Sequence, residues 1–224
     1  MKLSKIIVII LAVACMLSVF AACDIDDNEK SPETPKEYCE YAFDYLYAHA
    51  YKQTTVNTIV LDGETSKVTE VSHIDGSNYY IDHGYMIVTY CDGTMYVEKG
   101  DSKKKAVVDI AALGESVGLT EDYMTGIFDN LKDEDITLTR NADGTITLEF
   151  TVDIVVVGKY DYVVTLDKNN HIVKYVLLNE MTAMGYEMST TSEVTVEYGD
   201  QYKVTAPSDA DSYETVDSYY DLVT

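Results

Sequence analysis

The chain has 224 residues, of which 46% are hydrophobic and 25% are charged. This is the composition of a globular protein, and the length suits one domain with a sizeable core. The 16 Lys and Arg residues are outnumbered by 39 Asp and Glu residues, which gives a formal net charge of −23. Binding to a nucleic-acid backbone needs clustered cations, so this charge excludes nucleic acid as a partner.

The first 22 residues predict a signal peptide. Lys2 and Lys5 precede an apolar run over residues 6–20, which is shorter than the roughly 20 residues of a membrane-spanning helix. Two alanines directly precede Cys23, and this ending resembles the lipobox of bacterial lipoproteins. The resemblance implies cleavage before Cys23 and diacylglycerol on its thiol, so that fatty chains such as palmitate anchor the protein. We therefore expect the protein on the outer face of a bacterial cell membrane, with that membrane as a partner.

Two alternatives to lipidation of Cys23 remain open. Lipoboxes usually carry Leu three positions before the cysteine, where this chain has Phe20. Cleavage before Cys15 would leave residues 16–20 as an unexplained apolar stretch, and a plain secreted protein would leave Cys23 unmodified. Cleavage before Cys23 is the preferred interpretation, because it accounts for the whole apolar run.

The rest of the chain divides into three parts. Residues 23–35 predict an acidic stalk, because they are polar, contain proline and lack any apolar periodicity. Residues 36–207 are expected to form a single domain. Residues 208–224 form an acidic tail rich in tyrosine.

The domain is expected to begin with an amphipathic helix. Thr34-Pro35-Lys36-Glu37 has the pattern of a capping box, with proline at the first helical position. Helical spacing then continues to about Tyr51. It places one apolar face at Cys39, Ala42, Phe43, Leu46 and Ala50.

From Thr54 onward the hydrophobic period changes to two, which is typical of β-strands. Asp-Gly pairs favour tight hairpin turns, and they occur at Asp62-Gly63, Asp75-Gly76, Asp92-Gly93 and Asp143-Gly144. The clearest strand covers residues 145–157. Its apolar side chains on one face are Ile146, Leu148, Phe150, Val152, Ile154 and Val156.

Further strands are expected over residues 160–167, 172–181, 186–198 and 201–206. Between the two groups of strands, residues 109–132 have the pattern of helices. The order is therefore a helix, about five strands, a helical insertion and about five more strands, without an internal repeat.

This layout of lipobox, stalk, helix and interrupted meander resembles the Lol-type lipoprotein-carrier superfamily and related envelope lipid-binding lipoproteins. The resemblance covers residues 36–207, and residues 202–207 resemble the last strand of those proteins. It implies an α+β fold in which an antiparallel meander forms an incomplete barrel. The N-terminal helix and the central helical insertion would be the lid of an apolar cavity for acyl chains.

The expected ligand is a lipid or another apolar molecule, held between the sheet and the helices. Val163 and Leu177 make their strands apolar on both faces, so both faces need cover, and methionines suit a pliable pocket wall. The candidate cavity residues are Phe150, Val152, Ile154, Val156, Tyr162, Val164, Leu166, Met181, Met184 and Met188. A surface protein for structural or interaction roles, with a tightly packed interior, is the alternative.

Cys39 and Cys91 are the cysteines that remain after cleavage and lipidation. In an exported protein this pair would suit a disulfide between helix and sheet. Two buried free thiols are the preferred interpretation, because a domain of this size does not need a disulfide to be stable.

No motif in the sequence predicts catalysis, a metal or a cofactor. The four histidines are scattered, and His73 and His83 lie near expected turns, where exposure is the simplest interpretation. Nucleophile-elbow, phosphate-loop and dinucleotide fingerprints are absent. The basic run Lys103-Lys104-Lys105 has the pattern of a solvated loop. The sequence therefore predicts a binding protein rather than an enzyme.

Overall fold

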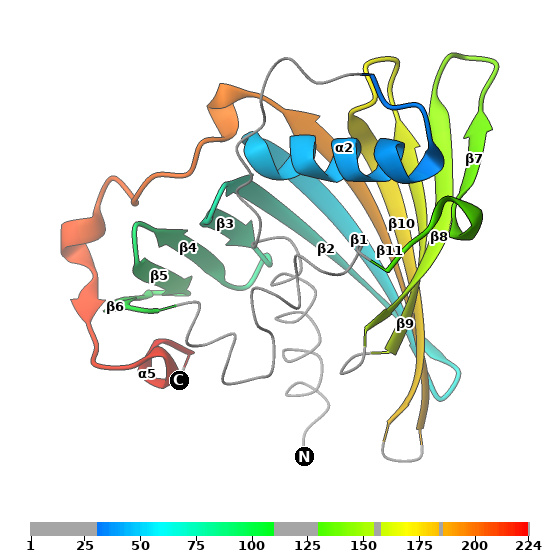
Figure 1. Ribbon diagram of the computed structural model, residues 1–224. Coiled ribbons are helices and arrows are strands. Elements are labelled where there is room, and N and C mark those ends of the chain that lie inside the picture. Colours follow the sequence, from blue (N-terminus) through cyan, green and yellow to red (C-terminus); the bar gives the residue numbers. More distant parts are fainter. Residues whose placement is uncertain (1–30, 110–129, 155–157, 184–185, 224) are drawn as a thin grey trace.

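The computed structural model describes residues 31–109, 130–154, 158–183 and 186–223. Within these residues the chain forms one sheet of 12 strands in the order β12-β6-β5-β4-β3-β2-β1-β11-β10-β9-β8-β7. Neighbouring strands are antiparallel except for β12 and β6, which are parallel. The sheet is curved and open, and helix α2 (Pro35–Ala48) lies across its concave side (Figure 1). The expected α+β class with an incomplete barrel is confirmed.

The strands form two groups along the chain. The first group is β1 (Tyr51–Leu61), β2 (Glu64–Asp75), β3 (Asn78–Asp82), β4 (Ile87–Cys91), β5 (Thr94–Lys99) and β6 (Ser102–Val107). The second group is β7 (Thr137–Arg140), β8 (Ile146–Ile154), β9 (Gly158–Leu166), β10 (Ile172–Ala183) and β11 (Tyr186–Tyr198). β12 (Glu214–Thr215) lies near the C-terminus.

Pairing between β1 and β11 joins the two groups into one sheet. The register runs from Tyr51 opposite Tyr198 to Leu61 opposite Met188, so the two strands pair along the whole of β1. This pairing links segments that are far apart in the sequence, so local sequence patterns could not predict it. It turns two meanders into a continuous curved surface.

Tight turns join the strands of the first group. Asp62 and Gly63 have φ values of 51° and 79°, which fit the positive pair of a type I′ turn, and Asp92 and Gly93 repeat it with 49° and 80°. These two predicted turns are confirmed.

The two other predicted turns differ in position or length. Asp75 remains in β2, paired with Asn78, so the turn there consists of Gly76 and Ser77. The loop that holds Asp143 and Gly144 is longer, because the pairing of β7 with β8 stops at Arg140 and Ile146.

Helix α2 begins as the capping box predicts. The Thr34 hydroxyl accepts a hydrogen bond from the Glu37 amide at 3.3 Å, and the Glu37 carboxylate accepts one from the Thr34 amide at 3.0 Å. The helix ends at Ala48 rather than near Tyr51. His49 has extended backbone angles, and the chain must leave the helix there because Tyr51 already pairs in β1.

Two apolar clusters stabilise the sheet. The larger lies between α2 and the concave face, where Cys39, Ala42 and Phe43 pack against strands of both groups. The smaller lies on β5 and β6 around Met95 and Val97. Burial of a full Leu, Val or Phe side chain stabilises a fold by about 1.5–3 kcal/mol, so the larger cluster holds the helix in place.

Residues 201–206 do not form the expected strand. The chain makes a 3-10 turn at Asp200–Tyr202 and then continues without sheet pairing. The turn starts because the amide of Tyr202 donates to the carbonyl of Gly199 at 2.9 Å, and this directs the chain away from β11.

The central helical insertion falls mostly outside the described residues. Residues 130–132 are described and are not helical, and a 3-10 turn follows at Asp133–Asp135. Within the described ranges, none of the helices is long and apolar enough to cross a membrane.

Residues 208–223 wrap around the outer strand of the first group, and we call them the C-terminal strap. The strap contains a 3-10 turn (Ala210–Ser212), β12 and the short helix α5 (Tyr219–Val223). β12 pairs with β6 at Lys104 and Lys105. Leu222 of α5 then enters the smaller apolar cluster.

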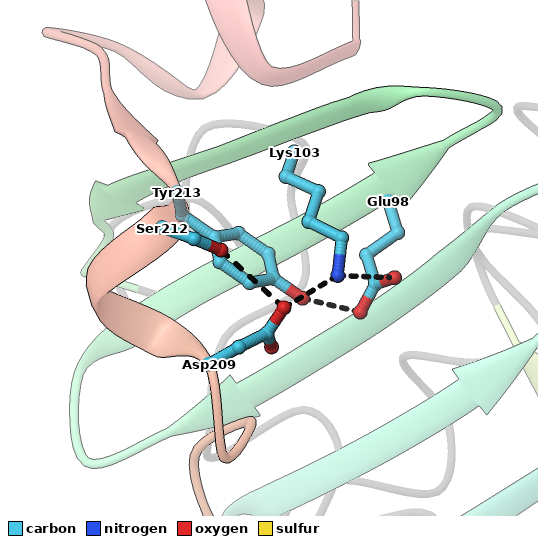
Figure 2. A network of polar contacts seen from close by, with 5 residues as sticks. All are labelled: Glu98, Lys103, Asp209, Ser212 and Tyr213. Carbon is cyan, nitrogen blue, oxygen red and sulfur yellow. Dashed lines mark hydrogen bonds and ion pairs between the residues drawn. The ribbon is translucent and has the colours of Figure 1, made fainter.

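A polar network fastens the strap to the convex face of β5 and β6 (Figure 2). The Lys103 ammonium lies 2.7 Å from Asp209 and 3.4 Å from Glu98, and the Tyr213 hydroxyl donates to Glu98. Ser212 donates a further hydrogen bond to Asp209 at 3.3 Å. Lys103, Lys104 and Lys105 are thus strand residues that hold the strap, so the expected solvated loop is wrong.

Candidate functional site

The concave face of the sheet brings most of the predicted cavity residues together. Phe150 and Tyr162 stack across β8 and β9 with ring centroids 5.0 Å apart, and Phe43 of α2 meets Tyr162 edge-on at 6.4 Å. Burial raises the pKa of the Tyr162 phenol well above its usual value, so the ring is neutral. This end of the face is therefore aromatic and uncharged.

The predicted cavity residues fall into three sets. Those that are buried in the larger cluster are Phe150, Val152, Tyr162, Val164 and Leu166. Met188 is also buried, at the far end of β11. Ile154 and Met181 lie in β8 and β10, whereas Val156 and Met184 lie outside the described residues.

A row of buried polar side chains crosses the middle of the concave face. It consists of Gln53, Thr55 and Asn57 of β1 with Glu70 and Ser72 of β2, and we call it the polar strip. Each of these residues is at most 7% exposed. The strand register places Thr55 opposite Glu70 and Gln53 opposite Ser72, so the five side chains form one patch.

Some groups of the polar strip have partners and others do not. Gln53 accepts a hydrogen bond from the Tyr175 hydroxyl at 3.0 Å, and Asn57 accepts one from Ser192 at 2.6 Å. The hydroxyls of Thr55 and Ser72 are buried, and neither has a hydrogen-bond partner in the described part of the chain. A buried hydroxyl without a partner costs about 1–3 kcal/mol. The strip therefore carries unused capacity for hydrogen bonds.

His83 lies beside the polar strip and contacts Glu70. Its Nδ1 is 2.8 Å from the Glu70 carboxylate, and the two side chains are 10% and 4% exposed. The expected surface position of His83 is wrong. Residues at alternate positions of an extended segment share a face, so His83, directly after β3, lies on the same concave side as Ile81.

The sequence contained one signal for the polar strip. Gln53, Thr55 and Asn57 stand at alternate positions between Tyr51 and Ile59, which are both buried. Period-two alternation places all five on one face. Polar residues at alternate positions are typical of a solvated face, and only the low exposure of these side chains in the folded sheet shows that this face is the buried one.

An open pocket of about 660 Å³ lies at the edge of β8. The short strand β7 pairs only with residues 146–149, so the remainder of β8 borders this pocket. Its lining residues are Asn130, Leu131, Asp135, Thr137, Glu149, Phe150, Thr151, Val152, Asp153, Asp161, Tyr162 and Val163. Phe150, Val152 and Tyr162 thus connect the pocket with the concave face.

Cys39 and Cys91 are both buried as free thiols, so the disulfide considered from the sequence is not formed. Cys39 belongs to the larger cluster beneath α2. Cys91 ends β4, where its sulfur lies 3.8 Å from the carbonyl oxygen of Val204. The two residues therefore belong to separate environments.

Metal binding finds no support in the described ranges. There, no group of three His, Cys, Asp or Glu side chains is placed to hold a metal ion. His171 stacks on Tyr45 with centroids 3.6 Å apart, and its pKa is lowered mainly by burial. This ring is thus engaged in packing.

Comparisons with known proteins show similarity to solved structures alone. No family model and no curated protein matches the chain. LprF from Mycobacterium bovis has a TM-score of 0.45 at 14% identity, covering 77% of this chain and 95% of that one. A DUF1329 family protein from Desulfovibrio piger has a TM-score of 0.29 at 12% identity, covering 84% and 97%.

A third structure is a putative outer membrane lipoprotein-sorting protein domain from Vibrio parahaemolyticus. It has a TM-score of 0.24 at 8% identity and covers 68% of this chain and 86% of that one. These identities and TM-scores are too low to transfer a role from those proteins to this chain.

Proposed function

We propose that the protein is a membrane-anchored lipoprotein that binds a lipid or another apolar ligand on the concave face of its sheet. The observation that carries the proposal is that buried side chains on the concave face extend beyond the part of the sheet that α2 crosses. The helix crosses one end of the sheet, whereas buried side chains continue along β1 and β11 to Ile59 and Met188. Both residues lie outside the two apolar clusters of described residues.

The chemistry of this far part suits an apolar guest. Ile59 pairs with Thr190 and Leu61 pairs with Met188, so apolar side chains of two strands are neighbours there. Each apolar Å² removed from water stabilises a complex by about 25 cal/mol. Methionine adapts to varied apolar shapes, which supports binding of fatty chains over binding of one rigid molecule.

The anchor is the second part of the proposal. Diacylglycerol on Cys23 would hold the domain at the outer face of the membrane, and two fatty chains anchor durably where one is marginal. In cells that produce the protein, Cys23→Ala should move it from the membrane fraction to the soluble fraction. Cys15→Ala should leave it in the membrane fraction, and the opposite result for the two variants would reject lipidation at Cys23.

The ligand is tested with the chain produced from residue 24, which keeps every residue that the structure describes. Native mass spectrometry of protein purified without detergent should detect bound apolar molecules. Ile59→Glu places a charge on the concave face and should abolish the bound species. Val60→Glu is the matched control on the convex face and should retain them. Ligand-free protein in repeated preparations would overturn the proposal.

An interaction or structural protein without a ligand is the second candidate. It is favoured by the dense packing beneath α2, where Leu148, Val164, Leu166 and Ile172 are 0% exposed. Interiors packed to this degree leave no room for a guest. This candidate predicts that Ile59→Glu and Val60→Glu behave alike in the mass spectrometry experiment.

A further inference from the structure

We infer that the polar strip is a subsite for an uncharged headgroup rich in hydroxyls, carried by an amphipathic ligand whose apolar part lies toward Ile59 and Met188. The inference rests on the proposed function and deepens it, because it names the class of ligand. It begins from the hydrogen-bond capacity that the fold leaves unused on the concave face.

The position of the strip suits a headgroup. Along β1 the concave face changes from Tyr51, in the larger cluster, to the polar strip and then to Ile59. Thr55 and Ile59 are four residues apart, about 13 Å at the rise of an extended strand. A ligand with a polar end and a fatty chain would therefore meet both kinds of surface at once.

The unpartnered hydroxyls point to a ligand with donors and acceptors of its own. Thr55 and Ser72 are 7% and 2% exposed, and their hydroxyl oxygens have no hydrogen-bond partner among the described residues. Thr190, the neighbour of Ile59 on β11, has a buried hydroxyl in the same condition. Each hydroxyl can donate one hydrogen bond and accept two, which matches a sugar or glycerol headgroup.

The charges around the strip argue against an ionic headgroup. The five residues of the strip include no Lys or Arg, and His83, which lies beside the strip, has its Nδ1 2.8 Å from the Glu70 carboxylate. Among the described residues, the strip offers a phosphate no Lys or Arg as a partner, and burial of a phosphate without a cation is costly. A quaternary ammonium would have to compete with His83 for the Glu70 carboxylate. Neutral hydroxyls avoid both costs.

The test compares amphiphiles that share one chain and differ in headgroup. The probes are dodecyl maltoside, dodecyl phosphate and dodecyltrimethylammonium, added below their micelle concentrations to the chain produced from residue 24. Isothermal titration calorimetry should give a Kd for dodecyl maltoside about ten-fold or more below the other two. Equal or tighter binding of either ionic probe would overturn the inference.

Matched variants assign the preference to the strip. Thr55→Val removes an unpartnered hydroxyl at nearly constant shape, so the melting temperature should stay constant or rise. The same variant should weaken dodecyl maltoside about ten-fold and leave the ionic probes unchanged. Thr54→Val lies on the opposite face of the same strand and should leave the affinity for dodecyl maltoside and for the two ionic probes unchanged. A loss of affinity in both variants, or in neither, would reject the assignment.

The outcomes separate the two proposals. If none of the three probes binds, the proposed function fails and the inference fails with it. If all three bind equally and Thr55→Val has no effect, the inference fails while the binding of apolar ligands stands.

Discussion

The thiols of Cys39 and Cys91 illustrate what burial does to single residues. Burial is the main cause that raises the pKa of Cys39 to about 12, and it raises the pKa of Cys91 as well. Only the thiolate reacts with disulfide reagents. Both cysteines should therefore be nearly inert in the native protein.

This prediction is checked with a chromogenic disulfide reagent near pH 8, where an unperturbed thiol is partly ionised. The chain produced from residue 24 should react on the order of ten-fold or more faster in denaturant than in buffer. Cys39→Ala leaves one thiol and separates the two sites. Rapid native reaction of Cys39 would contradict its buried position.

Single residues were predicted from the sequence where the alternation of one strand decided their place. Phe150, Val152 and Tyr162 are buried as predicted, because a continuous apolar face leaves one orientation for the strand. His83 was placed wrongly. A histidine beside a turn is usually exposed, and here its partner Glu70 comes from a different strand whose register the sequence does not reveal.

At the scale of elements, the N-terminus of α2 depends on a contact from the distant segment at 133–135. The Asp133 carboxylate accepts a hydrogen bond from the Lys36 amide at 2.9 Å. This backbone hydrogen bond is the main cause that holds the pKa of Asp133 below its usual value. Helix N-termini expose amides without partners and favour negative charge, so Asp133 stabilises α2.

Asp133→Asn should lower the melting temperature at neutral pH. The folded state depresses the pKa of Asp133, so the stabilisation is present above the carboxyl's ordinary pKa and is lost as pH falls through the depressed value. The difference between wild type and variant should therefore narrow toward pH 3 or below. Glu134→Gln, in the same 3-10 turn, is the control and should show little effect at any pH. A pH-independent difference for Asp133→Asn would contradict this role.

Elements with local signals were predicted well, and elements that depend on distant pairing were not. The capping box located the start of α2, and alternation located β8 and β11. β7 has four residues, too few for a visible period, and it exists because β8 pairs with it. The polar strip was missed because polar side chains at alternate positions of β1 do not reveal which face the folded sheet buries.

At the scale of the whole molecule, the C-terminal strap covers one edge of an open sheet. Exposed edges present unpaired backbone groups that recruit other strands. Removal of residues 208–224 would uncover β6 and expose apolar side chains such as Val97. We expect this truncated protein to self-associate, as measured by light scattering, whereas wild type remains monodisperse.

A point variant separates the contribution of the Lys103 ion pairs from that of β12 and α5. Lys103→Met removes the ion pairs with Glu98 and Asp209 but leaves Leu222 in its cluster. Exposed ion pairs contribute about 0.2–1 kcal/mol, so this variant should remain monodisperse. Self-association of Lys103→Met to the same degree as the truncation would contradict the view that β12 and α5 cover the edge.

Because the chain is synthesised from its N-terminus, β6 is made well before the C-terminal strap that covers it. Lys105 meets Ala210 across a separation of 105 residues. During synthesis, the edge strand β6 therefore stays unpaired on one side until the second group of strands and the strap have been made. Partly folded chains with unpaired edge strands are prone to aggregation. A chaperone that shields this strand until the strap arrives would be most useful in that interval.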